Sequence, residues 1–94
     1  MADELRKVFK IIQDRKKNPK PDSYTNSLFN KGEEEILAKI DEESKEVIKA
    51  IKENEGNKRL LEEVDDLFYH VFVLMVEKGL TFEDLENEEK KRMK

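Results

Sequence analysis

The chain has 94 residues, of which 45% are charged and 36% are hydrophobic, and its formal net charge is −4. This length allows one domain, residues 1–94, with a modest hydrophobic core. The negative net charge disfavours broad electrostatic attraction to nucleic acid or to an anionic membrane. Because the sequence contains no cysteine, disulfides, thiolate catalysis and cysteine zinc sites are excluded.

Membrane insertion is not expected either. The longest uninterrupted apolar run covers residues 71–76, whereas a membrane-spanning helix needs about 20 apolar residues. The N-terminal sequence MADELRKVFK lacks the apolar region of a signal peptide. The sequence therefore predicts a cytoplasmic protein with no membrane partner.

The first predicted helix covers about residues 3–17, where Leu5, Val8, Phe9 and Ile12 recur at helical spacing. The next segment, RKKNPKPDS, contains two prolines, which lack amide donors and favour extended backbone before them, so it is expected to be a loop. A short helical turn is then expected around residues 23–29, closed near Gly32.

Two long helices are predicted next, over about residues 33–52 and 58–78, separated by the turn sequence ENEGN. In the first, residues such as Ile40, Ile48 and Ile51 suggest one buried face. The apolar set of the second is too broad for a single stripe. This breadth favours contact with a partner chain. The set is Leu60, Leu61, Val64, Leu67, Phe68, Val71, Phe72, Leu74 and Met75.

Thr81 and Asp84 have the spacing of a capping box, which predicts a last helix over about residues 82–92. No strand-like alternation is present. The predicted fold class is therefore all-α, a helical bundle of four main helices per chain with its core completed by dimerisation.

Acidic residues on the two long helices fall into an inward and an outward group. At about 100° per residue, Glu43 and Glu46 lie in or beside the apolar sector of the first long helix. On the second, Glu63, Asp66 and His70 form one strip along the edge of the apolar face. Glu42, Glu62 and Asp65 point away from the apolar faces, and each alone is typical of a solvated surface. Asp41 lies on the other flank of its helix.

The inward acids can be explained in two ways. They can be an ordinary charged helix edge, or they can bind a cation. A partly buried ionised carboxylate is costly unless it is paired, and too few inward basic residues lie nearby to pair all of these acids, with Lys39 as one candidate. Acids at i and i+3 on two facing helices suit Mg²⁺, with Mn²⁺ as an alternative. His70 alone fits either a histidine at the core edge or a substrate contact.

The rest of the chemical inventory favours phosphoryl chemistry with a metal ion. The sequence offers no convincing nucleophile and no glycine-rich phosphate loop. Bound phosphates would rely on a metal and on basic residues such as Arg15 and Lys39. A di-iron bundle site is disfavoured, because the single histidine has Leu67 three residues before it instead of a glutamate.

The combination of motifs resembles a known family. The sequences EESKE at 42–46 and EVDD at 63–66 are similar to the E-E-x-x-E and E-x-x-D signature of the all-α nucleoside triphosphate pyrophosphohydrolases, the MazG-like superfamily. With DSYTNSLFNKG at 22–32 and DLFYH at 66–70, the chain resembles the phosphoribosyl-ATP pyrophosphatases of histidine biosynthesis. The resemblance extends from Leu5 to about Arg92.

This resemblance implies Mg²⁺-dependent hydrolysis of phosphoribosyl-ATP to phosphoribosyl-AMP and pyrophosphate by a homodimer. It implies metal binding by Glu43, Glu46, Glu63 and Asp66. Glu42 would be a further ligand or the base for water, and Glu42 and Glu43 are the candidate catalytic residues. The candidate substrate-binding residues are Arg15, Ser23, Tyr24, Thr25, Lys39 and His70.

Two alternatives remain open on the sequence. One is a MazG-like housecleaning pyrophosphatase, which would hydrolyse ordinary or damaged nucleoside triphosphates efficiently. The other is a non-catalytic helical interaction module whose acids only confer solubility. Val64 and Asp65 depart from the small residues that the family often has at these positions, and the C-terminal NEEKKRMK matches it loosely.

Overall fold

A computed structural model describes residues 3–93. It contains α1 (Asp3–Lys17), α2 (Tyr24–Lys31), α3 (Glu33–Lys52), α4 (Asn57–Glu77) and α5 (Phe82–Arg92). Among the described residues there is no strand, so the all-α prediction is confirmed. The long helices begin and end within one residue of their predicted limits. The expected count of four main helices is wrong for these residues, because the short turn at 23–29 is a complete fifth helix, α2.

Helix α2 is defined by a residue at each end. The Ser23 side chain caps its N-terminus and accepts a hydrogen bond from the Asn26 amide at 3.2 Å. At its C-terminus Gly32 has φ 95°, in the left-handed region that favours glycine, and its amide bonds to the Leu28 carbonyl at 3.0 Å. The chain therefore changes direction within one residue and continues directly into α3.

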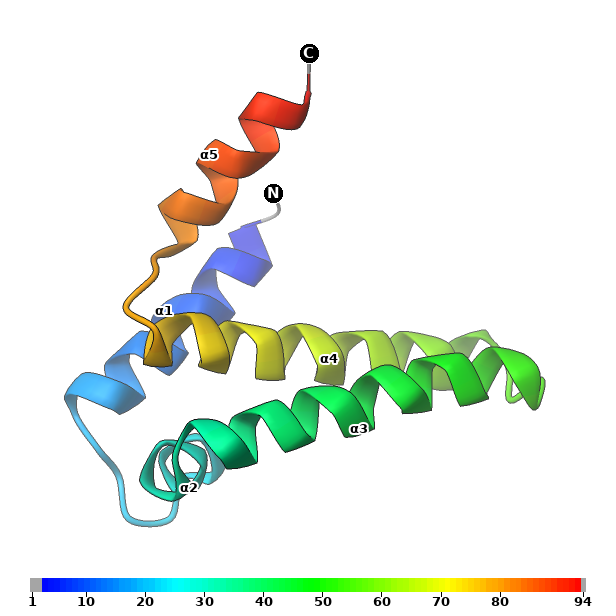
Figure 1. The fold of residues 1–94 in the computed structure, drawn as a ribbon, viewed down its shortest axis with the longest axis horizontal. Coiled ribbons are helices and arrows are strands. Elements are labelled where there is room, and N and C mark those ends of the chain that lie inside the picture. Colours follow the sequence, from blue (N-terminus) through cyan, green and yellow to red (C-terminus); the bar gives the residue numbers. More distant parts are fainter. Residues whose placement is uncertain (1–2, 94) are drawn as a thin grey trace.

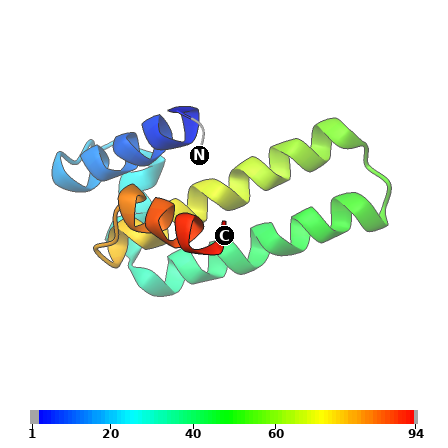
Figure 2. The same ribbon diagram turned by 90° about the horizontal axis from the view of Figure 1, so that it is seen from above.

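Helices α3 and α4 form a long antiparallel hairpin, and the other helices gather at one end of it (Figures 1 and 2). The turn between them, residues 53–56, contains Asn54 and Gly56 with positive φ. At the opposite end of the hairpin, α1 crosses α4 and α5 rises away from it (Figure 1). The capping box predicted at Thr81 and Asp84 is present at the start of α5.

The hydrophobic core lies where α1, α2 and α5 meet the hairpin. Three aromatic rings form its centre, with centroid distances of 5.2 Å for Phe9 and Phe72 and 5.6 Å for Phe9 and Phe82. The remaining fully buried members come from four different helices and tie α1, α2, α3 and α4 together. They are Ile12, Leu28, Ile36 and Val73.

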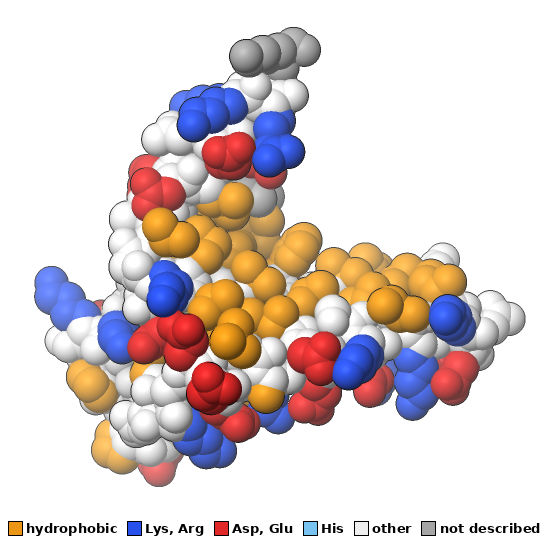
Figure 3. Space-filling model, in the orientation of Figure 1, with side chains coloured by type: hydrophobic (Ala, Val, Ile, Leu, Met, Phe, Trp, Pro, Cys, Tyr) orange, Lys and Arg blue, Asp and Glu red, His pale blue; other side chains and the backbone are white. Residues whose placement is uncertain are grey.

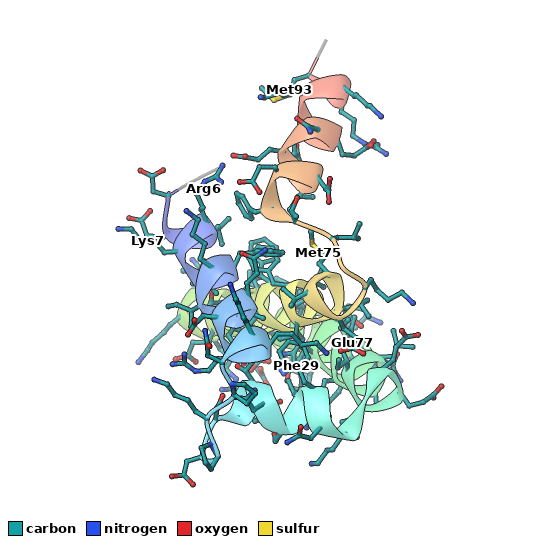
Figure 4. The ribbon with its side chains drawn as sticks, turned by 90° about the vertical axis from the view of Figure 1, so that its left-hand side faces the viewer. Arg6, Lys7, Phe29, Met75, Glu77 and Met93 are labelled. Carbon is teal, nitrogen blue, oxygen red and sulfur yellow. The ribbon has the colours of Figure 1, made fainter. Side chains whose placement is uncertain are left out.

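Charged side chains hold α1 against its neighbours around this core. Lys16 contacts Glu77 of α4 at 2.8 Å, and its ammonium group lies 4.6 Å from the centre of the Phe29 ring of α2. Arg6 forms ion pairs with Glu83, at 2.6 Å, and Glu86 at the base of α5. Figure 4 shows Arg6 beside α5, and Phe29 and Glu77 near the other end of α1. The Arg6 pairs hold the start of α1 against α5, and the Lys16 contacts hold the end of α1 that leads into the proline-containing loop.

The chain alone has an open shape. Its radius of gyration is 14.3 Å, larger than the roughly 12 Å expected of a compact chain of this length. Hydrophobic side chains gather over the inner corner between α5 and α4 and continue along α4 (Figure 3). Ile48 and Ile51, expected on a buried face, are 53% and 63% exposed, so that expectation is wrong for the isolated chain.

Of the described helices, none combines the length and the hydropathy needed to cross a membrane.

Candidate active site

The acidic motifs lie opposite each other on the α3 and α4 hairpin. One carboxylate oxygen from each of Glu43, Glu63 and Asp66 lies within 4.8 Å of the other two. Glu63 is only 4% exposed, whereas Asp66 is exposed and Glu43 is intermediate. The helical spacing predicted that these residues would share one edge, and the structure brings all three to one point.

This cluster lines one wall of an open cleft of about 460 Å³. The other two acids of the EESKE motif, Glu42 and Glu46, line the same cleft without joining the compact trio. The Glu42 side chain is 59% exposed, and one of its oxygens lies 3.6 Å from the Lys39 ammonium group. Glu42 therefore lies at the solvent-facing margin of the cleft.

Basic residues in the cleft were missed by the sequence reasoning. Arg59 and Lys49 both line it, and Arg59 Nη2 lies 3.2 Å from Oε1 of the buried Glu63. Lys39, one basic candidate that the sequence offered, does not line the cleft. The i, i+4 spacing of Arg59 and Glu63 could have revealed this pair.

The Glu43 carboxyl group is partly buried and lies near other carboxylates. Burial raises the pKa of its carboxyl group, and the neighbouring Asp66 and Glu63 raise it further, while His70 lowers it. The group is therefore harder to ionise in the folded chain than in the unfolded chain. Without a bound cation, ionised Glu43 destabilises the fold.

Replacing Glu43 by Gln is expected to stabilise the metal-free protein at neutral pH. The raised folded-state pKa means that the wild type loses stability as the pH rises from the usual carboxyl pKa through the folded value. Removing the charge should gain up to about 1 kcal/mol, or roughly 4–8 °C in Tm. Thermal unfolding in EDTA at several pH values measures this difference, which should vanish below about pH 4. A Glu43→Gln variant that is less stable at neutral pH would contradict this account.

Arg59 is expected to act as the counter-charge of Glu63 when no cation is bound. Arg59→Gln would leave the buried Glu63 carboxylate without its 3.2 Å partner and should lower the free energy of unfolding in EDTA by about 1 kcal/mol. Millimolar Mg²⁺ should reduce this loss, because the cation would replace the guanidinium charge. Chemical denaturation with and without Mg²⁺ measures both effects. Equal losses in both conditions would show that Arg59 only supports the helix.

The second group of predicted site residues lies at the start of α2. Tyr24 is 51% exposed, and its hydroxyl lies 2.8 Å from Nε2 of the buried His70. Nδ1 of His70 lies 2.7 Å from the Asp66 carbonyl oxygen. Since a carbonyl only accepts, Nδ1 of His70 carries a proton and donates it to the Asp66 carbonyl oxygen. Partial burial raises the pKa of the Tyr24 hydroxyl, although Lys39 opposes the shift.

The structure gives the other residues of the SYT sequence structural contacts as well. The Ser23 hydroxyl caps α2. Thr25 is buried, and its hydroxyl contacts that of Tyr69. The Tyr69 side chain packs within the chain, against α2 and the core.

A separate cavity of about 600 Å³ adjoins this segment. It contains four of the six predicted substrate-binding residues, whereas Lys39 and His70 do not line it. His70 instead joins the two regions through its bonds to Tyr24 and Asp66. The cavity lining is Ile11, Arg15, Lys20, Pro21, Asp22, Ser23, Tyr24, Thr25 and Tyr69.

Chemically, the acidic cleft suits a hard divalent cation. The trio offers only carboxylate oxygens, which are the ligands that Mg²⁺ and Mn²⁺ prefer. Glu46 and Glu42 add further oxygens to the same cleft. The arrangement can bind a cation, and a phosphate held there would lie next to Arg59 and Lys49.

Comparison with known proteins agrees with these features. The family model of phosphoribosyl-ATP pyrophosphohydrolase matches residues 5–93. Two similar proteins, from Bacillus mycoides strain KBAB4 and Bacillus cereus strain B4264, are named phosphoribosyl-ATP pyrophosphatase. They are 50% and 47% identical over 92 residues, covering 98% of this chain and 85% of each relative. A protein of the same name from Bacillus anthracis is 48% identical over 88 residues, which cover 94% of this chain and 81% of that protein. The chain therefore belongs to the phosphoribosyl-ATP pyrophosphohydrolase family.

Proposed function

We propose that this protein hydrolyses phosphoribosyl-ATP to phosphoribosyl-AMP and pyrophosphate, the second step of histidine biosynthesis. The observation that carries this proposal is the convergence of Glu43, Glu63 and Asp66 at one point in a chain of this family. The acidic cleft is joined to the second cavity by the hydrogen bonds of Tyr24 and His70. A cytoplasmic location stays a prediction from the sequence.

The trio and Glu46 would hold Mg²⁺, with Mn²⁺ as a possible replacement. The all-oxygen donor set and the 4.8 Å limit on the trio's oxygen separations support this assignment. A bound divalent ion would neutralise phosphate charge and make a bound water more acidic. Ionised Glu43, disfavoured in the metal-free chain, would then be balanced by a positive charge.

In the reaction, water attacks either the α phosphorus, so that its bond to the bridging oxygen breaks and pyrophosphate leaves, or the β phosphorus, so that its bond to the bridging oxygen breaks and phosphoribosyl-AMP leaves. The proton of the attacking water goes to the carboxylate of Glu42 or Glu43. Glu42 suits this role because it is exposed at the margin of the cleft and lies beside Lys39. Glu43 suits it because its carboxylate belongs to the converging trio and so lies where a cation-bound water would be.

The substrate would extend from the acidic cleft past Tyr24 into the second cavity. The charge of Lys39 lowers the pKa of the Tyr24 hydroxyl. Lys39 would therefore lie beside the substrate, between the acidic cleft and the second cavity. Arg15, Ser23 and Thr25 line the cavity. His70 is buried and bonded on both sides, which suits a residue that orients Tyr24 toward the substrate.

A second copy of this chain would complete the fold. Along α3 and α4, apolar side chains at helical spacing are exposed, among them Ile51 at 63%, Leu61 at 68% and Phe68 at 43%. Phe68 also lines a groove of about 350 Å³ whose other lining residues are apolar except for Glu89. An exposed apolar surface of this kind is typical of a protein interface, and the open shape of the chain leaves it accessible. The proposed assembly is a homodimer.

The proposal is tested by comparing substrates. The purified protein with Mg²⁺ should release pyrophosphate from phosphoribosyl-ATP with a kcat/KM at least about 100-fold higher than for any ordinary NTP or dNTP. An ordinary nucleotide lacks the phosphoribosyl group and would leave the polar groups that bind it unpaired. Efficient turnover of free nucleotides would favour the housecleaning pyrophosphatase instead. Release of single phosphate would contradict both readings, and absence of any turnover would favour a non-catalytic module.

A further inference from the structure

The cavity beside α2 has the features of an anion-binding site that is separate from the acidic cleft. No residue lines both sites. Two cationic residues, Arg15 and Lys20, line the cavity together with one acid, Asp22. The acidic cleft has the opposite balance, with five acids and two bases. The two sites are therefore suited to different parts of one ligand.

The wall of the cavity is held in place by a buried amide. Asn26 is 6% exposed, and its Nδ2 donates to the Arg15 carbonyl at 2.6 Å. Its Oδ1 accepts from the Lys20 amide at 2.8 Å, and its own amide donates to Ser23 Oγ at 3.2 Å. One side chain thus fixes the end of α1 and the loop that carries Lys20. Such a buried polar network holds neighbouring groups rigidly when it is fully bonded.

The charged ends of both cationic residues are accessible to a ligand. Within the part of the chain that the structure describes, the Arg15 guanidinium forms one ion pair, with its neighbour Asp14 at 3.2 Å, and the Asp14 side chain is 52% exposed. An exposed pair of this kind contributes little and can be exchanged for another anion. Among residues 3–93, no acidic side chain pairs with Lys20. Arginine and lysine side chains whose charges are not held by a strong ion pair are common phosphate ligands.

The proposed substrate has two anionic parts. Phosphoribosyl-ATP carries the triphosphate of ATP and, attached to the adenine, a ribose with its own 5-phosphate. The acidic cleft would take the triphosphate through a cation. The second phosphate needs a cationic site further along, and the exposed ring of Tyr24 lies between the two sites.

We propose that Arg15 and Lys20, positioned by Asn26, bind the 5-phosphate of the phosphoribosyl group and so make the enzyme prefer phosphoribosyl-ATP to ATP. This inference rests on the proposed function, because it names the part of that substrate which the cavity takes. The geometry that supports it is the buried Asn26 network, which connects both residues to Ser23. The inference adds Lys20 and Asn26 to the candidate substrate-binding residues, and it names the 5-phosphate as the part of the substrate that they recognise.

The test measures the KM and kcat of Arg15→Gln and Lys20→Gln for phosphoribosyl-ATP, and the inhibition constant of ATP for each. Loss of one charged hydrogen bond should raise the KM about tenfold or more, with kcat nearly unchanged and the inhibition constant of ATP unchanged. Lys17→Gln is the matched control, since Lys17 is an exposed lysine at the end of α1 that does not line the cavity.

Other outcomes separate the two proposals. If the wild type does not hydrolyse phosphoribosyl-ATP, the proposed function fails. If the wild type does hydrolyse it, two results would show that Arg15 and Lys20 do not bind the 5-phosphate, while the proposed function stands. The variants could leave the KM for phosphoribosyl-ATP unchanged, or they could raise the inhibition constant of ATP by the same factor as the KM. Asn26→Ser should also raise the KM for phosphoribosyl-ATP and leave the inhibition constant of ATP unchanged. If Asn26→Ser lowers thermal stability and leaves the KM unchanged, Asn26 serves only the fold.

Discussion

Replacing Asp66 by Asn is expected to lower the rate of pyrophosphate release at least about 100-fold, because even groups that only support metal ligands are worth 10–100-fold. The Asp66 carboxylate is one of the three whose oxygens converge at one point. The substitution keeps the shape of the side chain and removes its charge. Far-UV circular dichroism should be unchanged, because Asp66 is exposed and contributes little to the core.

Asp65→Asn is the matched control. It is the same chemical change at the adjacent residue, which is exposed and does not line the acidic cleft. Its activity should stay within about twofold of the wild type, as expected of a surface substitution. If both variants kept the activity of the wild type, Asp66 would not be a ligand of a catalytic cation. Equal loss in both would show that the total charge of α4 matters, and the position of the carboxylate does not.

Replacing Phe68 by Glu is expected to separate the dimer. Phe68 is 43% exposed in the single chain and lines the apolar groove. In the proposed assembly its ring would be covered, so a charge there should raise the dissociation constant at least about 100-fold, since burying an unpaired charge costs several kcal/mol. Sedimentation velocity over a range of protein concentrations measures the change.

Leu80→Glu provides the comparison for this experiment. Leu80 is 47% exposed, similar to Phe68, but it follows α4 and does not line the groove. This variant should sediment like the wild type. A wild type that remains monomeric at tens of micromolar, or a Phe68→Glu variant that stays dimeric, would contradict the proposed interface.

The helices could be predicted closely because their signals are local. The periodic apolar residues of α3 and α4, the glycines after them and the Thr81 capping box depend on neighbours a few residues away. Helix α2 was underestimated because its eight residues carry a weak periodic signal, and its limits depend on the Ser23 cap and the conformation of Gly32. These are backbone details that composition does not show.

The acidic residues could also be placed, since spacing on a helix fixes the face on which each side chain lies. Residues whose role depends on long-range contacts could not. Asn26 reaches Arg15, eleven positions earlier in the chain, and nothing in its immediate sequence indicates this contact. Ile48 and Ile51 follow the apolar pattern but are exposed, because a pattern predicts burial without saying which chain provides the cover.

The central claim is that the carboxylates meeting between α3 and α4 catalyse metal-dependent cleavage of phosphoribosyl-ATP. The most direct test is pyrophosphate release by the wild-type protein from this substrate, with Mg²⁺, with EDTA, and after Mg²⁺ is restored in excess over EDTA. The account predicts stoichiometric pyrophosphate and phosphoribosyl-AMP with Mg²⁺, none with EDTA, and recovery when Mg²⁺ returns. Pyrophosphate release that is unaffected by EDTA, or no release under any condition, would contradict it.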